Sequence, residues 1–270
     1  MKAFLKKHLW IFTLTLSVCF IAVTTIGLYH VHNSPITQDN SPHSPSQSVE
    51  YVAVISSVLA DMTQEELVEE SSLVITAKLV DKSSAFQIKS VGGGVSNFTD
   101  YYFEPKTVLR GEVDGSPISV RVNEGISGNL EVVNEISYDF EIGNEYMLFL
   151  YQPSYGGGFT TEGDYYYVTG SQLGVYKLNS TQTRSNDKVY QSVIYSNESN
   201  IPNTASPISL SSFSAKVSQI NETTPPQDDL DYQLFLKAQQ ENLESGFISQ
   251  EEYEQFIAES QQYATILPEE

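Results

Sequence analysis

The chain has 270 residues but only one cysteine and four histidines, and their positions exclude several kinds of chemistry. Cys19 lies inside an apolar run, and all four histidines precede residue 44. The residues that follow supply no internal disulfide, no zinc site of Cys and His ligands, and no Ser-His or Cys-His nucleophile pair. We therefore expect no metal, no cofactor and no enzyme activity. The alternative that remains open is a secreted hydrolase that uses a pair of Asp or Glu carboxylates.

Basic residues are also scarce, with 14 Lys and Arg against 34 Asp and Glu, a net charge of −20. Three of the basic residues precede residue 8, so the rest of the chain carries 11 basic and 34 acidic residues, a net charge of −23. A surface of this sign repels nucleic acid and anionic lipid headgroups. We expect no nucleic-acid partner, and contact with a membrane only through the N-terminal segment.

The N-terminal segment predicts where the protein is located. Residues 1–8 are basic, and residues 9–29 carry no charge. A helix over these 21 residues is about 31 Å long, enough to cross a bilayer core. We predict a single-pass transmembrane signal anchor at 9–29, with residues 1–8 in the cytoplasm and the bulk of the chain extracellular. The alternative is a cleaved signal peptide, although no small-x-small cleavage site follows the run.

The lack of disulfides favours a bacterial cell surface, that of a Gram-positive organism, over a eukaryotic secreted domain. Residues 33–50 are rich in Ser and Pro and predict an extended spacer. Residues 51–178 contain short β-rich runs between Gly-rich turns, and predict a mainly β domain, either a five- to six-stranded barrel or a sandwich. Within it, residues 118–122 alternate as in a half-buried strand, and residues 146–151 are apolar on both faces, as in a central strand.

The last third of the chain predicts a polar linker and a helical hairpin. Residues 179–229 are mostly polar, with a short helix expected near 209–221 from apolar residues at helical spacing. Residues 230–263 predict two helices, because Ser245-Gly246 is a stop signal and Ser249 with Glu252 forms a capping box.

This hairpin contains the phrase LESGFISQEEYEQF, which resembles the SHOCT helical-hairpin module of bacterial proteins. The resemblance implies interaction or oligomerisation, and the alternative is a capped hairpin of no special kind. A hairpin of about 35 residues cannot bury the apolar side chains of its two helices by itself. Because Pro225-Pro226 separates the hairpin from the β domain, we expect it to be free to bind a protein partner or a second copy of the chain.

The order of elements in residues 60–178 carries a second resemblance. A helix capped by Thr63 and Glu66 is followed by the strand at 74–79, then by the turn Leu109-Arg110-Gly111, and then by the phrase GNEYML. This order is similar to the netrin-like module shared with tissue inhibitors of metalloproteinases, and implies an OB-like barrel of five strands. The cysteines of that family are absent, so inhibition through an N-terminal cysteine is not implied. Pro105 predicts an edge position or a bulge in its strand.

Residues 153–170, PSYGGGFTTEGDYYYVTG, have the composition of a binding loop. Glycine gives such a loop conformational freedom, and tyrosine offers rigid amphipathic contact area. The alternative is a hairpin loop whose tyrosines cover the β domain. The sequence thus predicts a membrane-anchored extracellular binding or assembly protein without catalytic residues. The predicted binding residues are Tyr155, Phe159, Tyr165, Tyr166 and Tyr167.

Overall fold

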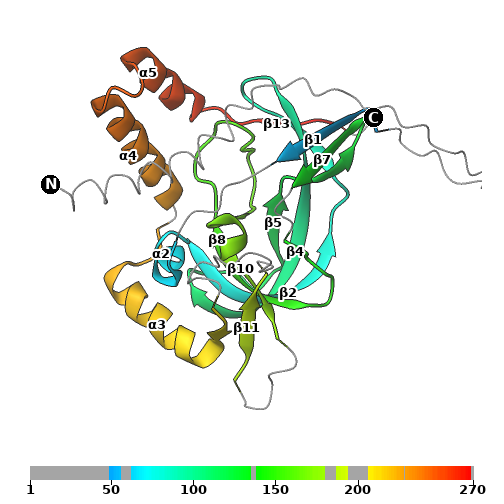
Figure 1. Cartoon of the computed structure of the whole chain (residues 1–270), viewed down its shortest axis with the longest axis vertical. Coiled ribbons are helices and arrows are strands. Elements are labelled where there is room, and N and C mark those ends of the chain that lie inside the picture. Colours follow the sequence, from blue (N-terminus) through cyan, green and yellow to red (C-terminus); the bar gives the residue numbers. More distant parts are fainter. Residues whose placement is uncertain are drawn as a thin grey trace, which may run out of the picture.

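A computed structural model describes residues 49–55, 62–134, 138–179, 187–193, 206–227 and 229–268. The predicted anchor at 9–29 and most of the predicted spacer lie outside these residues. Among the residues described, no helix is long and apolar enough to span a membrane. The chain is mainly β, with helices beside the sheet and a helical region near the C-terminus (Figure 1), which confirms the coarse fold class predicted from the sequence.

Short strands alternate with few helices along the chain. The helices are α2 (Gln64–Glu69), the 3-10 helix η1 (Ser171–Gly174), α3 (Leu210–Thr223), α4 (Leu230–Glu244) and α5 (Gln250–Glu259). The strands are β1 (Tyr51–Ile55), β2 (Leu73–Lys82), β3 (Phe86–Lys89), β4 (Val95–Arg110), β5 (Ile118–Val122), β6 (Gly125–Ser127), β7 (Leu130–Asn134), β8 (Glu145–Tyr151), β9 (Tyr167–Val168), β10 (Val175–Leu178), β11 (Val189–Ser192), β12 (Ile208–Ser209) and β13 (Thr265–Ile266).

Most strands join one open sheet. Its order is β12-β11-β10-β8-β2-β4-β3-β13, with β5 also paired to β4 and β9 to β8. Strand β8 lies between β2 and β10, and its residues from Tyr146 to Leu150 are fully buried. This confirms the central strand predicted from the apolar run. A single parallel bridge between Val120 and Tyr166 also connects β5 to the residue before β9.

Strand β4 contains the irregularity expected at Pro105. Thr76 of β2 pairs with Thr107, but the next residue, Ala77, pairs with Pro105, so Lys106 is an extra residue in β4. Proline has no backbone N–H to donate to a neighbouring strand, and a bulge removes that requirement locally. The bulge predicted from the sequence is therefore confirmed.

Alternation along β2 and β8 divides the apolar core into two large clusters. Leu73, Ile75 and Leu148 belong to the cluster on one face of the sheet. Val74 and Phe149 belong to the cluster on the other face, together with apolar residues of α2 and α3. Because successive residues of a strand point to opposite faces, the sheet is buried on both sides here.

Residues 179–229 differ from the polar linker predicted for them. Strands β11 and β12 extend the sheet, and α3 covers one of its faces, beside α2 (Figure 1). The helix forms over the segment where the spacing predicts one, and Phe213, Val217 and Ile220 are buried on its inner side. Three apolar residues at helical spacing are enough to attach an otherwise polar helix to the core.

The Arg110-Gly111 turn fixes two helices to the end of β4. Arg110 is 2% exposed, and its guanidinium donates 2.7 Å hydrogen bonds to the carbonyl oxygens of Ser71 and Thr224. Ser71 follows α2 and Thr224 caps α3, so the cation lies at the C-terminal ends of both helices, where their dipoles favour it. Gly111 has φ +75°, and a Cβ atom there would lie 2.3 Å from the carbonyl oxygen of Ser72.

The helical hairpin begins and turns as predicted, but its second helix, α5, ends at Glu259, before the predicted end at residue 263. Gly246 has φ +73°, and its N–H and that of Phe247 donate to carbonyls in the last turn of α4, which is the Schellman motif. Ser249 and Glu252 form the capping box of α5. The hairpin is not free of the β domain, however, because the chain continues past α5 into β13, which pairs antiparallel with β3.

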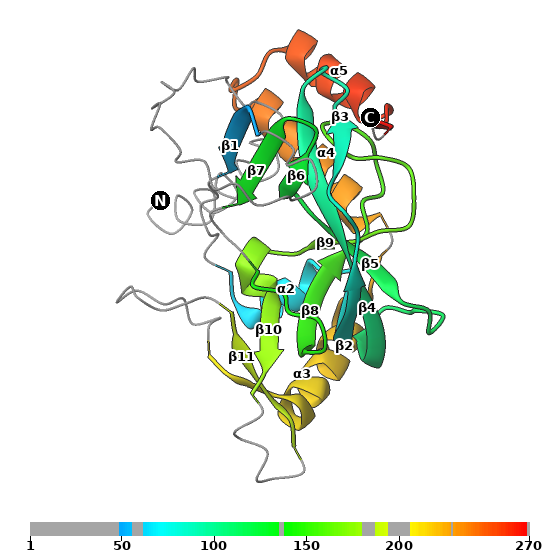
Figure 2. The same ribbon diagram turned by 90° about the vertical axis from the view of Figure 1, so that its right-hand side faces the viewer.

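A second, smaller sheet contains β1, β7 and β6. Strand β1 is parallel to β7, and β7 is antiparallel to β6 (Figure 2). Strand β1 follows the predicted spacer directly. It is therefore the first element of the described chain, but it does not belong to the main sheet.

Candidate functional site

The predicted binding loop, between β8 and β9, is bound along its backbone by the segment that follows α5. Gly156 N–H donates to the carbonyl of Ser260 at 2.9 Å, and Gly157 N–H donates to that of Gln262 at 2.7 Å. A Cβ atom on Gly156 would lie 2.0 Å from the Gln262 carbonyl oxygen. Glycine at this position therefore permits a close approach of two backbones, a role different from the conformational freedom expected from the sequence.

Tyr155 connects this loop to the helical hairpin. Its ring stacks on Phe235 of α4 with centroids 4.8 Å apart, and lies 5.3 Å from the ring of Tyr232. The neighbouring Ser154 N–H donates to the Asp231 carboxylate at 3.0 Å. Burial raises the pKa of Asp231, and this effect outweighs the hydrogen bonds from Ser154, which lower the pKa. The loop and the first two turns of α4 thus form one packed contact.

Phe159 packs in another direction, toward the end of the main sheet. Its ring centroid lies 5.6 Å from that of Phe98 on β4. Phe98 shares a small apolar cluster with Ile88 of β3 and with Ala264, which follows α5. Phe159 therefore helps to hold β3 and the C-terminal segment together.

The base of the loop is held by a buried ion pair. Arg121 on β5 binds both carboxylate oxygens of Asp100 on β4, with N–O distances of 2.7 and 2.8 Å. Its third nitrogen donates to the Thr161 hydroxyl at 2.7 Å. The guanidinium carbon lies 3.8 Å from the ring centroid of Tyr165 and 5.0 Å from that of Phe86. Such bidentate and cation–π contacts hold a side chain in one orientation.

The half-buried strand predicted for residues 118–122 is wrong at one position, Arg121, which is buried instead of facing solvent. It is only 7% exposed, although the alternation places it among the solvent-facing residues. The reason is its direct cross-strand partner, Asp100, which the register of β4 and β5 places opposite it. A buried charge is tolerated where it is paired and fully hydrogen-bonded.

The three consecutive tyrosines also make contacts within the chain. The Tyr165 hydroxyl accepts a hydrogen bond from the Thr161 N–H at 2.9 Å. The ring of Tyr167 meets that of Tyr165 edge-on at 5.3 Å, and Tyr166 packs against the core cluster that contains Leu148. The structure thus brings Tyr165 and Tyr167 together, whereas Tyr155 and Phe159 pack elsewhere.

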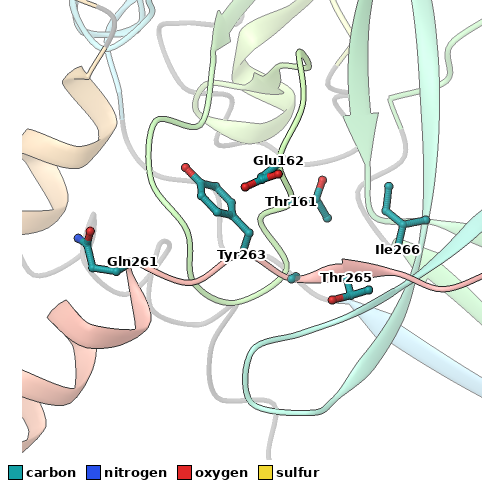
Figure 3. A pocket seen from close by; sticks show the side chains of 7 residues that line it. Thr161, Glu162, Gln261, Tyr263, Thr265 and Ile266 are labelled. Atoms are coloured by element: carbon teal, nitrogen blue, oxygen red, sulfur yellow. The ribbon is translucent and has the colours of Figure 1, made fainter.

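An open hollow of about 590 Å³ lies between the loop and the segment after α5 (Figure 3). The loop contributes Thr161 and Glu162, and the C-terminal segment contributes residues that sequence reasoning missed. No local signal marks these residues, because they reach the loop only through the pairing of β13 with β3. The hollow is lined by Thr161, Glu162, Gln261, Tyr263, Ala264, Thr265 and Ile266.

The chemistry of the lining suits recognition of a polar group. It offers two threonine hydroxyls, an amide, a phenol ring and one carboxylate, that of Glu162, and no basic side chain. A glycoside hydrolase needs two carboxylates about 5–10 Å apart, and this lining contains one. In the part of the chain that the structure describes, no three His, Cys, Asp or Glu residues are grouped to hold a metal ion.

Comparison with known proteins adds no functional information to this geometry. No model of a known protein family matches the chain, and no curated protein has a matching sequence. The chemistry of the hollow and of its supporting residues is therefore the basis for inferring function.

Proposed function

We propose that the protein is a membrane-anchored extracellular binding or assembly protein of the bacterial cell surface, without catalytic activity. Residues 9–29 are the single-pass anchor, residues 33–50 are the spacer, and the remainder is outside the cell. The observation that carries the binding role is the hollow beside Glu162, whose two walls are both fixed by buried contacts.

Both walls are arranged before any ligand arrives. The Thr161 hydroxyl accepts a hydrogen bond from Arg121, and the Thr161 N–H donates one to the Tyr165 hydroxyl. On the opposite wall, Ala264 N–H donates to the Thr160 carbonyl at 2.7 Å. A site with fixed walls loses less conformational entropy on binding, which favours affinity. Such support is typical of a preorganised recognition site.

Charge defines the class of ligand. The hollow contains the Glu162 carboxylate and no cation, and the whole chain has a net charge of −20. Electrostatic complementarity then favours a cationic group that donates hydrogen bonds, such as the ammonium groups of a basic peptide segment. The Thr265 hydroxyl and the Gln261 side-chain carbonyl offer further acceptors for such a group, whereas the buried Thr161 hydroxyl already accepts from Arg121.

Titration of the full chain, in detergent micelles, with a tetralysine peptide tests this role. We expect binding that persists at physiological salt and weakens about fivefold in Glu162→Gln, since one partly exposed charge pair contributes up to about 1 kcal/mol. Glu251→Gln on α5 is the matched control, because it removes the same charge from an exposed position outside the hollow. Equal weakening by both variants would mean that peptide binding reflects only the acidic surface, and would refute the site.

The anchor is tested separately by cysteine labelling. In a Cys19→Ser background, Lys2→Cys and Ser245→Cys each provide one thiol. A membrane-impermeant maleimide applied to intact cells should label residue 245 but not residue 2. Labelling of both positions, or recovery of the protein from the medium, would refute the predicted topology.

We also propose that strands β2, β4, β5, β9 and β8 form an OB-like barrel of the netrin type, and that the C-terminal hairpin is SHOCT-like. The support for the barrel is that β2 pairs with both β4 and β8, while the Val120–Tyr166 bridge connects β5 to β9. The Tyr166 N–H donates to the backbone carbonyl of Ser119 at 2.8 Å, and the Arg121 N–H donates to the backbone carbonyl of Tyr166 at 2.9 Å. Slow hydrogen exchange at these two amides is expected if the ring is closed, and rapid exchange would contradict it.

A further inference from the structure

Strand β1 is exposed on both faces and forms one edge of the small sheet. Tyr51, Val52 and Val54 are 58%, 59% and 56% exposed, which is unusual for apolar residues of a regular strand. The strand contains no charge, no proline and no bulge, the usual devices that prevent an edge strand from pairing with another chain. Among the strands that the structure describes, only β7 pairs with β1, so the other edge of β1 has backbone groups without a strand partner and its apolar side chains are exposed.

The outward face of the small sheet continues this exposed surface. Val52 pairs across the sheet with Glu131, and Glu131 pairs with Ile126, so these three side chains share a face. Val54 and Val133 form the next row. Ile126 and Val133 are also exposed. Glu131 takes part in none of the ion pairs among the described residues. The face is thus apolar with one carboxylate at its centre.

We propose that β1 pairs antiparallel with β1 of a second copy of this chain, about a two-fold axis at Ala53. The two small sheets then join into one sheet of six strands, in which the two β1 strands are neighbours. The contact is isologous, so that the same surface is used on both copies, as in most homodimers.

The sequence of β1, Tyr-Val-Ala-Val-Ile, is complementary to itself in this register. With Ala53 at the axis, Val52 lies opposite Val54 of the partner subunit, and Tyr51 lies opposite Ile55 of the partner subunit. Ala53 meets its own symmetry mate, where a small side chain fits the close approach at the axis. Pairs of β-branched and aromatic residues are those that stabilise neighbouring strands, and no like charges face each other among these residues.

Charge decides between edge pairing and face-to-face packing. Packing the two outward faces together would bring the Glu131 carboxylates of both copies into one apolar interface, which is costly for an unpaired charge. Edge pairing leaves the two β7 strands three strand spacings apart, about 14 Å. This exceeds the screening length of about 8 Å at physiological salt. Edge pairing is therefore the arrangement that an acidic chain tolerates.

The expected affinity is low. A strand of five residues buries less than the roughly 1,200 Å² of a standard interface, so the dimer should be weak and transient in solution. If the anchor of the proposed function is correct, confinement to one membrane raises the effective concentration and favours the dimer. Failure of the anchor would lower the occupancy of the dimer but would leave its geometry unchanged.

Disulfide trapping tests the register directly. In the full chain with Cys19→Ser, Ala53→Cys places two thiols across the axis, where directly opposed residues have Cα atoms about 4.5–5.5 Å apart, within disulfide range. Two further variants, Val52→Cys and Val54→Cys, are given tags of different size and mixed. Ser245→Cys, an exposed thiol on the helical hairpin, is the control.

We expect Ala53→Cys to cross-link at least tenfold faster than Ser245→Cys, and the mixed 52–54 disulfide to form faster than either homodimer. The Val52→Lys, Val54→Lys double variant should lose concentration-dependent dimerisation in sedimentation while its melting temperature stays unchanged, because both side chains are exposed. Dimerisation that persists in the lysine variant, or cross-linking no faster at residue 53 than at residue 245, would overturn the proposal and assign association to another surface.

Discussion

Replacement of Arg121 by Met tests whether the buried ion pair supports the hollow. The substitution leaves the carboxylate of Asp100, whose side chain is 12% exposed, without its bidentate partner. Loss of one member of a buried pair typically costs about 3–5 kcal/mol, because the other charge stays buried. We expect this loss in the free energy of unfolding of residues 49–270, measured by urea denaturation at neutral pH.

The control variant is Lys106→Met, which removes the other cation of β4 and β5 that forms an ion pair. Lys106 lies 3.0 Å from Glu104 with both side chains more than a third exposed, so its loss should cost less than about 1 kcal/mol. Hydrogen exchange at the Thr161 amide, which donates to Tyr165, should accelerate in Arg121→Met alone. Equal losses of stability in the two variants would refute the role of the buried pair.

Three further predictions concern the core, a partly buried acid and the loop. Leu148→Ala in the central strand should cost about 2–5 kcal/mol in urea denaturation, whereas Val95→Ala, at an exposed position, should change stability by less than about 0.5 kcal/mol. Burial, together with repulsion from Glu66 and Glu69, raises the pKa of Glu70 to about 7, so the folded state is stabilised by protonation and its stability falls as the pH rises from about 4.5 to 7. Glu70→Gln should therefore leave stability unchanged at pH 4 but increase it by about 1–3 kcal/mol at pH 8, and no difference between the two pH values would contradict this. Gly156→Ala should separate the loop from the C-terminal segment, seen as faster exchange of the Gly157 and Ala264 amides with the core amides of β8 unchanged.

Features that depend on neighbouring residues are predicted correctly from the sequence. The capping boxes at Thr63 and Ser249, and the helix end at Gly246, follow from side chains within a few positions of each other. The central strand β8 follows from an unbroken apolar run, and the bulge follows from Pro105. In each case the residues that determine the cap, strand or bulge belong to that same short segment of the chain.

Features that depend on distant pairing are not predicted. The burial of Arg121 requires the register that places Asp100 opposite it, and the attachment of the hairpin requires β13 to reach β3. The same limit applies to the candidate site. The loop around Tyr155 is recognisable by composition, but Gln261 and Tyr263 enter the hollow from about 100 residues further along the chain.

The backbone contacts of this loop also determine the order in which the molecule is completed. Residues 156–160 are bonded to partners at 260–264, roughly 100 residues later in the chain. At about 5–20 residues per second, synthesis delivers these partners on the order of 5–20 seconds after the loop itself. The β domain therefore has time to pack while the hollow still lacks one wall. A chain that stops near residue 259 would retain most of its core but would lack the residues from 261 to 266 that line the hollow, so the binding proposed for the hollow requires synthesis to continue past them.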